Sequence, residues 1–190
     1  MKKWIDSIID EKILLLEEVK NGDYSKKLIE ASKMMSDAIK GNNKVLVAGN
    51  GGSACDAQHL VGELVGRFML DRKAMPAVSL GVDSAVVTSI SNDYGYEEVF
   101  ARQVSGLGNK GDVFVGITTS GNSENIVRAV TAAKEKGMYT VGLLGCGGGK
   151  LASSCDVALI VPSNNVARIQ EIHTFSVHVL CENIEKTLFG

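Results

Sequence analysis

Two patterns of apolar residues divide the chain. Up to residue 41, apolar side chains recur every three or four positions among charged ones, which is typical of amphipathic helices. From residue 42 onward, short apolar runs alternate with helical stretches, which predicts strands that are buried on both faces. The expected strands are 45–48, 77–80, 113–118, 140–144 and 157–161, and the expected helices lie near 53–69, 84–91, 96–107, 123–136 and 166–188.

This alternation predicts an α/β fold. We expect a three-layer sandwich, in which helices cover both faces of a mostly parallel five-stranded sheet. Residues 1–190 should form a single domain, with 1–41 as N-terminal helices and 42–190 as the α/β core. The first helix has apolar residues on more than one face, so we expect it to pack against another subunit, or else to cover the sheet.

Charge and composition exclude several classes of protein. The net charge is −2, whereas a general nucleic-acid binder would carry a basic face. No apolar run approaches the ~18 residues that cross a membrane, and acidic residues follow Met1-Lys-Lys-Trp4 where a signal peptide would be apolar. The four cysteines have no CxxC spacing, so we expect them to be reduced in a cytoplasmic protein.

A glycine-rich turn follows the first expected strand. The sequence Gly49-Asn-Gly-Gly-Ser53 leads from a buried strand into a helix. Free N–H groups at a helix start attract anions, and Gly51 and Gly52 allow positive φ and close approach of a ligand. Ser53 is expected to cap the helix or to bind a ligand oxygen.

A second turn is rich in hydroxyl groups. Thr118-Thr-Ser-Gly-Asn-Ser123 follows the strand 113–118 and opens another helix. Hydroxyls and free helix N–H groups suit a phosphate monoester, and the density of hydroxyls favours this over a serine-rich helix cap. In a parallel sheet the two turns and Asn92-Asp93 should share one crevice, because ligands bind at the carboxyl ends of the strands.

Histidines supply the third set of candidates. His59 and Glu63 are four residues apart on one expected helix, so they could bind a metal or act as acid and base, or simply form a surface pair. His178 lies among Phe175, Val177 and Val179, and we expect it to be buried there with a partner.

Five ordered motifs together resemble the sugar isomerase (SIS) family, which has a flavodoxin-like fold, and within it the isomerases of seven-carbon sugar phosphates. They are Gly49-Asn-Gly-Gly-Ser53, Cys55-Asp-Ala-Gln-His59 with Glu63, Asn92-Asp-Tyr-Gly95, Thr119-Ser-Gly-Asn-Ser123 and Arg168-Ile-Gln-Glu-Ile-His173. The likeness runs from about residue 40 to the C-terminus. Two positions depart from it: Ala167 stands where some members have Asp, and Thr118 where Ser is common.

The resemblance implies a cytoplasmic homotetramer that converts D-sedoheptulose 7-phosphate to D-glycero-D-manno-heptose 7-phosphate, the first step toward nucleotide-activated heptose for lipopolysaccharide or capsule. It implies Glu63 as catalytic base and His178 as catalytic acid, which we expect to meet at a subunit interface. It also implies one zinc ion per subunit, bound by His59, Glu63, Gln170 and His178. The implied substrate contacts are Asn50, Gly51, Gly52, Ser53, Glu63, Arg67 (across a subunit boundary), Asn92, Asp93, Thr118, Thr119, Ser120, Ser123 and Gln170.

Three other functions compete with this interpretation. A non-catalytic SIS paralogue that binds a replication initiator would lack the acid and base positions, whereas Glu63 and His178 are present here. A sugar-phosphate-sensing regulator needs a DNA-binding segment, and none is visible. A dinucleotide-binding oxidoreductase is suggested by Gly49-x-Gly51-x-x-Ala54, but no acidic residue for the ribose follows at the required distance.

Overall fold

The computed structural model describes residues 1–190, and its centre is one fully parallel sheet. The strand order is β2-β1-β3-β4-β5, and the register sets Val47 beside Val115 and Val115 beside Val141. The central strands β1 and β3 are buried at every residue, as expected for strands covered on both faces. The strands are β1 (Val45–Gly49), β2 (Ala77–Ser79), β3 (Val113–Thr118), β4 (Tyr139–Leu144) and β5 (Val157–Ile160).

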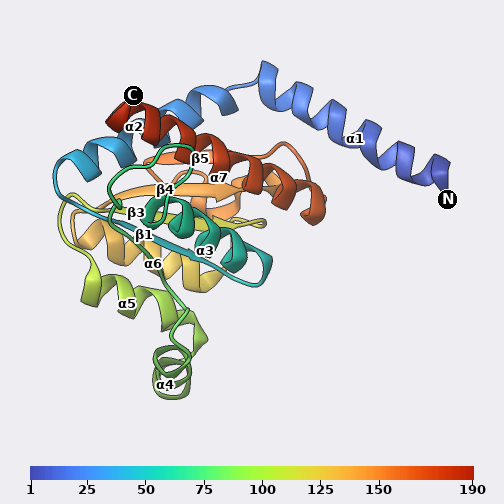
Figure 1. Ribbon diagram of the computed structural model, residues 1–190. Coiled ribbons are helices and arrows are strands. Elements are labelled where there is room, and N and C mark those ends of the chain that lie inside the picture. Colours follow the sequence, from blue (N-terminus) through green and yellow to red (C-terminus); the bar gives the residue numbers. More distant parts are fainter.

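Helices cover both faces of the sheet, which confirms the three-layer prediction (Figure 1). Because alternate strand residues face opposite sides, Val45 and Val47 pack with α2, α3 and α7, whereas Leu46 and Ala48 pack with α5 and α6. The helices are α1 (Lys2–Asn21), α2 (Tyr24–Lys40), α3 (Gly52–Val65), α4 (Ser84–Tyr94), α5 (Val99–Leu107), α6 (Glu124–Glu135) and α7 (Val166–Phe189), with short 3-10 turns η1 (Tyr96–Glu98) and η2 (Cys146–Leu151).

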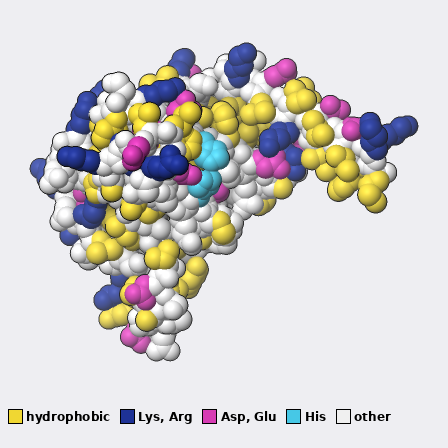
Figure 2. Space-filling model, in the orientation of Figure 1, with side chains coloured by type: hydrophobic (Ala, Val, Ile, Leu, Met, Phe, Trp, Pro, Cys, Tyr) yellow, Lys and Arg dark blue, Asp and Glu magenta, His cyan; other side chains and the backbone are white.

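Two helices project from this body. α1 extends away from the sheet, and only Leu15 and Val19 near its end are buried (Figure 1). Hydrophobic side chains lie exposed along it (Figure 2): Trp4, Ile5, Ile9, Ile13, Leu14 and Leu16. α4 stands out at the opposite end of the molecule and contains no buried residue (Figure 1). Both helices therefore present surface that the single chain leaves uncovered.

One predicted boundary was wrong for a structural reason. The helix expected over 53–69 ends at Val65, because the backbone leaves the helical conformation at Gly66, and the side chain of Arg72 binds the free carbonyl oxygens of Glu63 and Leu64. The other boundaries differ from prediction by a few residues at most. No helix combines the length and the apolar composition that crossing a membrane requires.

Candidate functional site

The two predicted turns lie side by side at the carboxyl edge of the sheet. β1 and β3 are neighbours, but the helices that follow them, α3 and α6, cover opposite faces. Such a point, where the chain switches faces, is where open α/β sheets bind ligands. A cavity of about 260 Å³ opens there, lined by Asn50, Ser123 and Asn125 with Tyr96, Glu97 and Glu124.

The glycine turn after β1 follows the prediction at Gly51, but Gly52 does not take a positive φ and Ser53 does not cap the helix. Gly51 has φ +56°, a value that favours glycine. At Gly52 an added Cβ would lie 2.5 Å from Nε2 of Gln170, so only glycine lets the α7 side chain reach this turn. Ser53 does not cap the helix, because α3 begins at Gly52, and the N-cap residue Gly51 has no side chain.

Asn50 is fixed by two residues that the sequence did not reveal. Its amide exchanges two hydrogen bonds with the amide of Asn125, at 2.9 and 2.8 Å. Its Oδ1 also accepts a hydrogen bond from the hydroxyl of Tyr96 at 2.9 Å. No local signal could have identified Asn125, since its partner is 75 residues away and one asparagine at a helix start is common.

In the hydroxyl turn after β3, the side chain of Thr118 contacts two of the serine hydroxyls. This buried threonine places its Oγ1 2.8 Å from Ser123 Oγ and 3.3 Å from Ser120 Oγ. Ser120 Oγ accepts the backbone N–H of Asn122 at 3.1 Å, whereas Thr119 is half-buried. Ser123 is the N-cap of α6, yet its hydroxyl forms no bond with the helix amides, so the simple capping role is not observed. The turn therefore combines hydroxyls with the free amides of a helix start.

His59, Glu63 and His178 form a cluster within one chain. The ligand atoms of the three side chains all lie within 4.8 Å of one another. His59 Nε2 is 3.1 Å from Glu63 Oε1 and 3.2 Å from His178 Nε2. The expectation that Glu63 and His178 meet across a subunit interface was therefore wrong: α3 and α7 pack together and bring both residues to one site.

The burial of the histidines also differs from prediction. His178 is exposed, although its neighbours in sequence are apolar, because Val177 and Leu180 occupy the other side of α7. The ring of Phe68 stacks on it at 5.9 Å with an interplanar angle of 27°. His173 is the fully buried histidine; burial lowers its pKa, and its Nε2 lies 3.1 Å from the carbonyl oxygen of Leu144. Figure 2 shows histidine side chains at the surface of this face.

The donor set of the cluster fits a divalent cation. An imidazole nitrogen offers one proton or one lone pair, so His59 Nε2 cannot serve both a carboxylate and a second imidazole well. A cation among the three ligand atoms would accept a lone pair from each. Two imidazoles and a carboxylate are ligands that zinc prefers, and Gln170 lies on the same helix as His178, about two turns earlier.

Three predicted substrate residues remain apart from these groups. Asn92 and Asp93 lie exposed on the projecting α4, where Asn92 Nδ2 donates to Asp93 Oδ1 at 2.8 Å. Arg67 is exposed in the loop that follows α3. No hydrogen bond or ion pair joins any of them to the other candidates.

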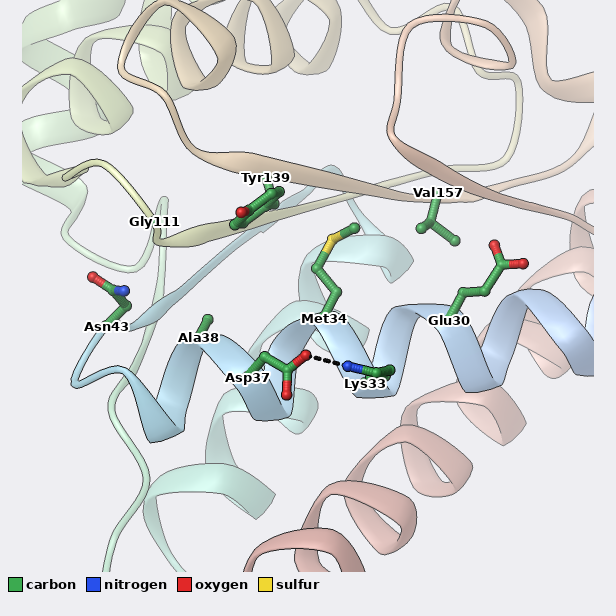
Figure 3. A pocket seen from close by; sticks show the side chains of 9 residues that line it. All are labelled: Glu30, Lys33, Met34, Asp37, Ala38, Asn43, Gly111, Tyr139 and Val157. Atoms are coloured by element: carbon green, nitrogen blue, oxygen red, sulfur yellow. Dashed lines mark hydrogen bonds and ion pairs between the residues drawn. The ribbon is translucent and has the colours of Figure 1, made fainter.

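A larger cavity of about 580 Å³ lies elsewhere. It is located between α2 and the amino ends of β4 and β5, where Lys33 pairs with Asp37 beside Met34 and Tyr139 (Figure 3). It contains none of the candidate residues and opens at the edge of the sheet opposite the two turns. We therefore place the functional site at the carboxyl edge, despite the smaller cavity there.

Comparison with known proteins gives one consistent result. Residues 9–145 match the family described as SIS domain. Phosphoheptose isomerase of Sulfurimonas denitrificans is 47% identical over 191 residues, which cover 100% of this chain and 98% of that protein. The solved structure of a phosphoheptose isomerase from Francisella tularensis is 39% identical with a TM-score of 0.93 and covers 97% of both chains. That of phosphoheptose isomerase from Neisseria gonorrhoeae is 39% identical with a TM-score of 0.91 and covers 97% of this chain and 98% of its own.

Proposed function

The chain belongs to the SIS domain family, and from this premise we propose that it isomerises D-sedoheptulose 7-phosphate to D-glycero-D-manno-heptose 7-phosphate. The observation that carries the proposal is the meeting of Glu63 and His178 in one chain, on the helix α3 that starts at the glycine turn and on the helix α7 whose Gln170 reaches that turn. A non-catalytic paralogue would not need this acid and base pair.

The reaction moves a proton between C1 and C2 of an open-chain sugar. Glu63 removes a proton from C1, the electron pair forms a C1=C2 double bond, and His178 protonates the carbonyl oxygen at C2. The resulting enediol then loses the proton of the C1 hydroxyl and gains a proton at C2, which yields the aldehyde. Both groups lie close enough to act on adjacent atoms of one substrate.

The two turns hold the rest of the substrate. Thr118, Thr119, Ser120 and Ser123, with the first amides of α6, bind the phosphate. Asn50, Gly51, Gly52 and Ser53, together with Gln170, contact the sugar near the reacting carbons. Asn125 and Tyr96 support this role by fixing the amide of Asn50.

Zinc is the metal that this donor set suits. His59, Glu63 and His178 would hold one ion per chain, and Gln170 would complete the set. A bound zinc ion supplies Lewis-acid polarisation of the sugar oxygens. The proton transfers remain the work of Glu63 and His178.

The exposed surfaces support assembly into a homotetramer. The apolar stripe of α1 is costly to leave in water, and packing against a second chain would bury it. In the tetramer Arg67, Asn92 and Asp93 would reach the site of a neighbouring chain, since they are exposed in their own. We place the enzyme in the cytoplasm, at the first step toward nucleotide-activated heptose for lipopolysaccharide or capsule.

One experiment tests the activity. The protein is incubated with sedoheptulose 7-phosphate in D₂O, and products are followed by NMR, with fructose 6-phosphate as a comparison substrate. We expect an aldoheptose 7-phosphate that carries deuterium at C2, because a proton passing through an enzyme base exchanges with solvent. If neither a product nor deuterium exchange is detected with either sugar phosphate, the chain is a binding protein of the same family.

A further inference from the structure

The side chain of Arg72 binds the end of α3, in the helix turn that carries Glu63. Its Nη2 donates to the carbonyl oxygen of Glu63 at 2.7 Å, and its Nη1 to those of Leu64 at 2.8 Å and Gly66 at 3.2 Å. The last carbonyls of a helix have no partner within the helix, and a cation there also interacts favourably with the helix dipole. Arg72 therefore fixes the turn of α3 that carries Glu63.

Glu185 holds the same segment from α7. Its Oε1 accepts a hydrogen bond from Nε of Arg72 at 3.0 Å, and its Oε2 accepts the backbone N–H groups of Met69 and Leu70, each at 2.9 Å. The side chains of Arg72 and Glu185 are each only 2% exposed. Burial alone would raise the pKa of Glu185, but these backbone N–H groups and the guanidinium outweigh it and hold the pKa below its usual value.

The loop between α3 and Arg72 also contacts His178. Phe68, next to Met69, stacks on the ring of His178. Glu185 follows His178 by seven residues, which is two turns along the same side of α7. One buried ion pair thus connects the helix turn of Glu63, the ring that covers His178, and the helix that carries His178.

We propose that Arg72 and Glu185 are positioning residues. Their ion pair, called the strap below, keeps Glu63 and His178 at the distance that catalysis requires. Neither Arg72 nor Glu185 belongs to the proposed acid, base or ligand set. The strap acts through the backbone of α3 and through Phe68. The kinetic part of this inference rests on the proposed function, whereas its structural part does not.

The chain offers a matched control for the strap. The carboxylate of Asp112 accepts two backbone N–H groups, those of Lys44 and Asn109, and pairs with the ammonium of Lys44. It is 1% exposed, and it resembles Glu185 in chemistry and burial, but its partners are the segments that precede β1 and β3. Glu185→Gln and Asp112→Asn therefore remove the same kind of buried charge, but only Glu185 binds the segment next to Phe68.

Both variants are compared with the natural chain first by Tm. Three further measurements are then made below their melting temperatures: kcat with KM, the Zn²⁺ dissociation constant by chelator competition, and the NMR shifts of the His178 ring. The melting temperature of both variants should be lower than that of the natural chain. Only Glu185→Gln should lower kcat about tenfold or more, with a smaller change in KM, and weaken Zn²⁺ binding about tenfold, since groups that orient metal ligands typically contribute 10–100-fold. Its His178 signals should also move as Phe68 shifts.

Equal effects of the two variants on kcat, Zn²⁺ affinity and the His178 signals would overturn the proposal and leave the ion pair a structural one. If Glu185→Gln does not fold, Arg72→Lys and Phe68→Leu replace it, because Lys keeps the charge with fewer donors and Leu removes only the stacked ring. If the natural chain shows no isomerase activity, Zn²⁺ affinity and the His178 signals still decide the outcome.

Discussion

The Nε2 atoms of His59 and His178 lie 3.2 Å apart, although 119 residues separate the two histidines in the chain. α3 supplies the first and α7 the second, and both helices cover the same face of the sheet. The site therefore depends on the packing of these two helices as much as on the identity of its residues.

Glu63→Gln should abolish most of the activity. The amide keeps the shape of the side chain but cannot accept the C1 proton, so kcat should fall on the order of 10²-fold or more, with the substrate still bound. Initial rates followed by NMR check this, and Glu135→Gln on α6 is the control. Turnover near that of the natural chain would remove Glu63 from the mechanism.

The hydroxyl turn should control affinity for the phosphate. Ser120→Ala and Ser123→Ala remove contacts that ground state and transition state share, so KM should rise more than kcat falls. Ser154→Ala provides a comparison, because its hydroxyl bonds only to Lys150 O of its own turn. Unchanged KM in both loop variants would show that the hydroxyls serve only the local structure.

Zinc should stabilise the natural chain. A ligand present at 100 times its Kd adds about 2.7 kcal/mol to the free energy of unfolding, so Tm should rise on titration with Zn²⁺. His178→Ala removes one of the three converging ligands and should suppress the rise, whereas Glu182→Gln, a change at a half-buried side chain on the same helix, should not. An identical rise in His178→Ala would place the ion elsewhere.

The four cysteines should divide into two classes. Cys55 and Cys146 are exposed, whereas burial raises the pKa of Cys155 and of Cys181 to about 12, with the charge of Glu63 as a further cause at Cys181. A thiol reagent at pH 8 should therefore label two cysteines at once and the other two only after unfolding. Fast labelling of all four would contradict this burial.

The same thiols predict a loss of stability at high pH. Their folded pKa is above the unfolded value of about 8.5, so the folded state holds more protons between pH 8.5 and 12. The contribution is complete below pH 8.5 and is lost as pH rises toward 12, by at most about 2 kcal/mol per thiol at pH 10. Urea unfolding at pH 8 and pH 10 measures it, and Cys155→Ala with Cys181→Ala should reduce the difference.

The stripe on α1 should hold the assembly together. Ile5, Ile9, Ile13 and Leu16 follow one another at helical spacing, and all are exposed in the single chain. Ile9→Glu with Ile13→Glu places charges in that stripe, so light scattering should show a smaller particle, whereas Asp10→Ala with Glu17→Ala should leave its size unchanged. A monomeric natural chain would refute the tetramer directly.

The sequence determined the features that depend on local pattern. Alternating apolar runs and helical stretches predicted five strands in a three-layer fold, because strand and helix periods can be read within a few residues. The glycine and hydroxyl turns were located for the same reason: each follows directly on a buried strand and opens a helix.

The tertiary structure decided what depends on residues far apart in the chain. The sequence predicted that His178 is buried among apolar residues and that it meets Glu63 across a subunit interface. In the structure α3 packs against α7, so that His178 is exposed and both residues lie in one chain. The Asn50–Asn125 pair and the Arg72–Glu185 strap were equally hidden, across 75 and 113 residues. Such contacts arise from helix packing over the sheet, and no periodicity along the chain encodes which two helix faces will meet.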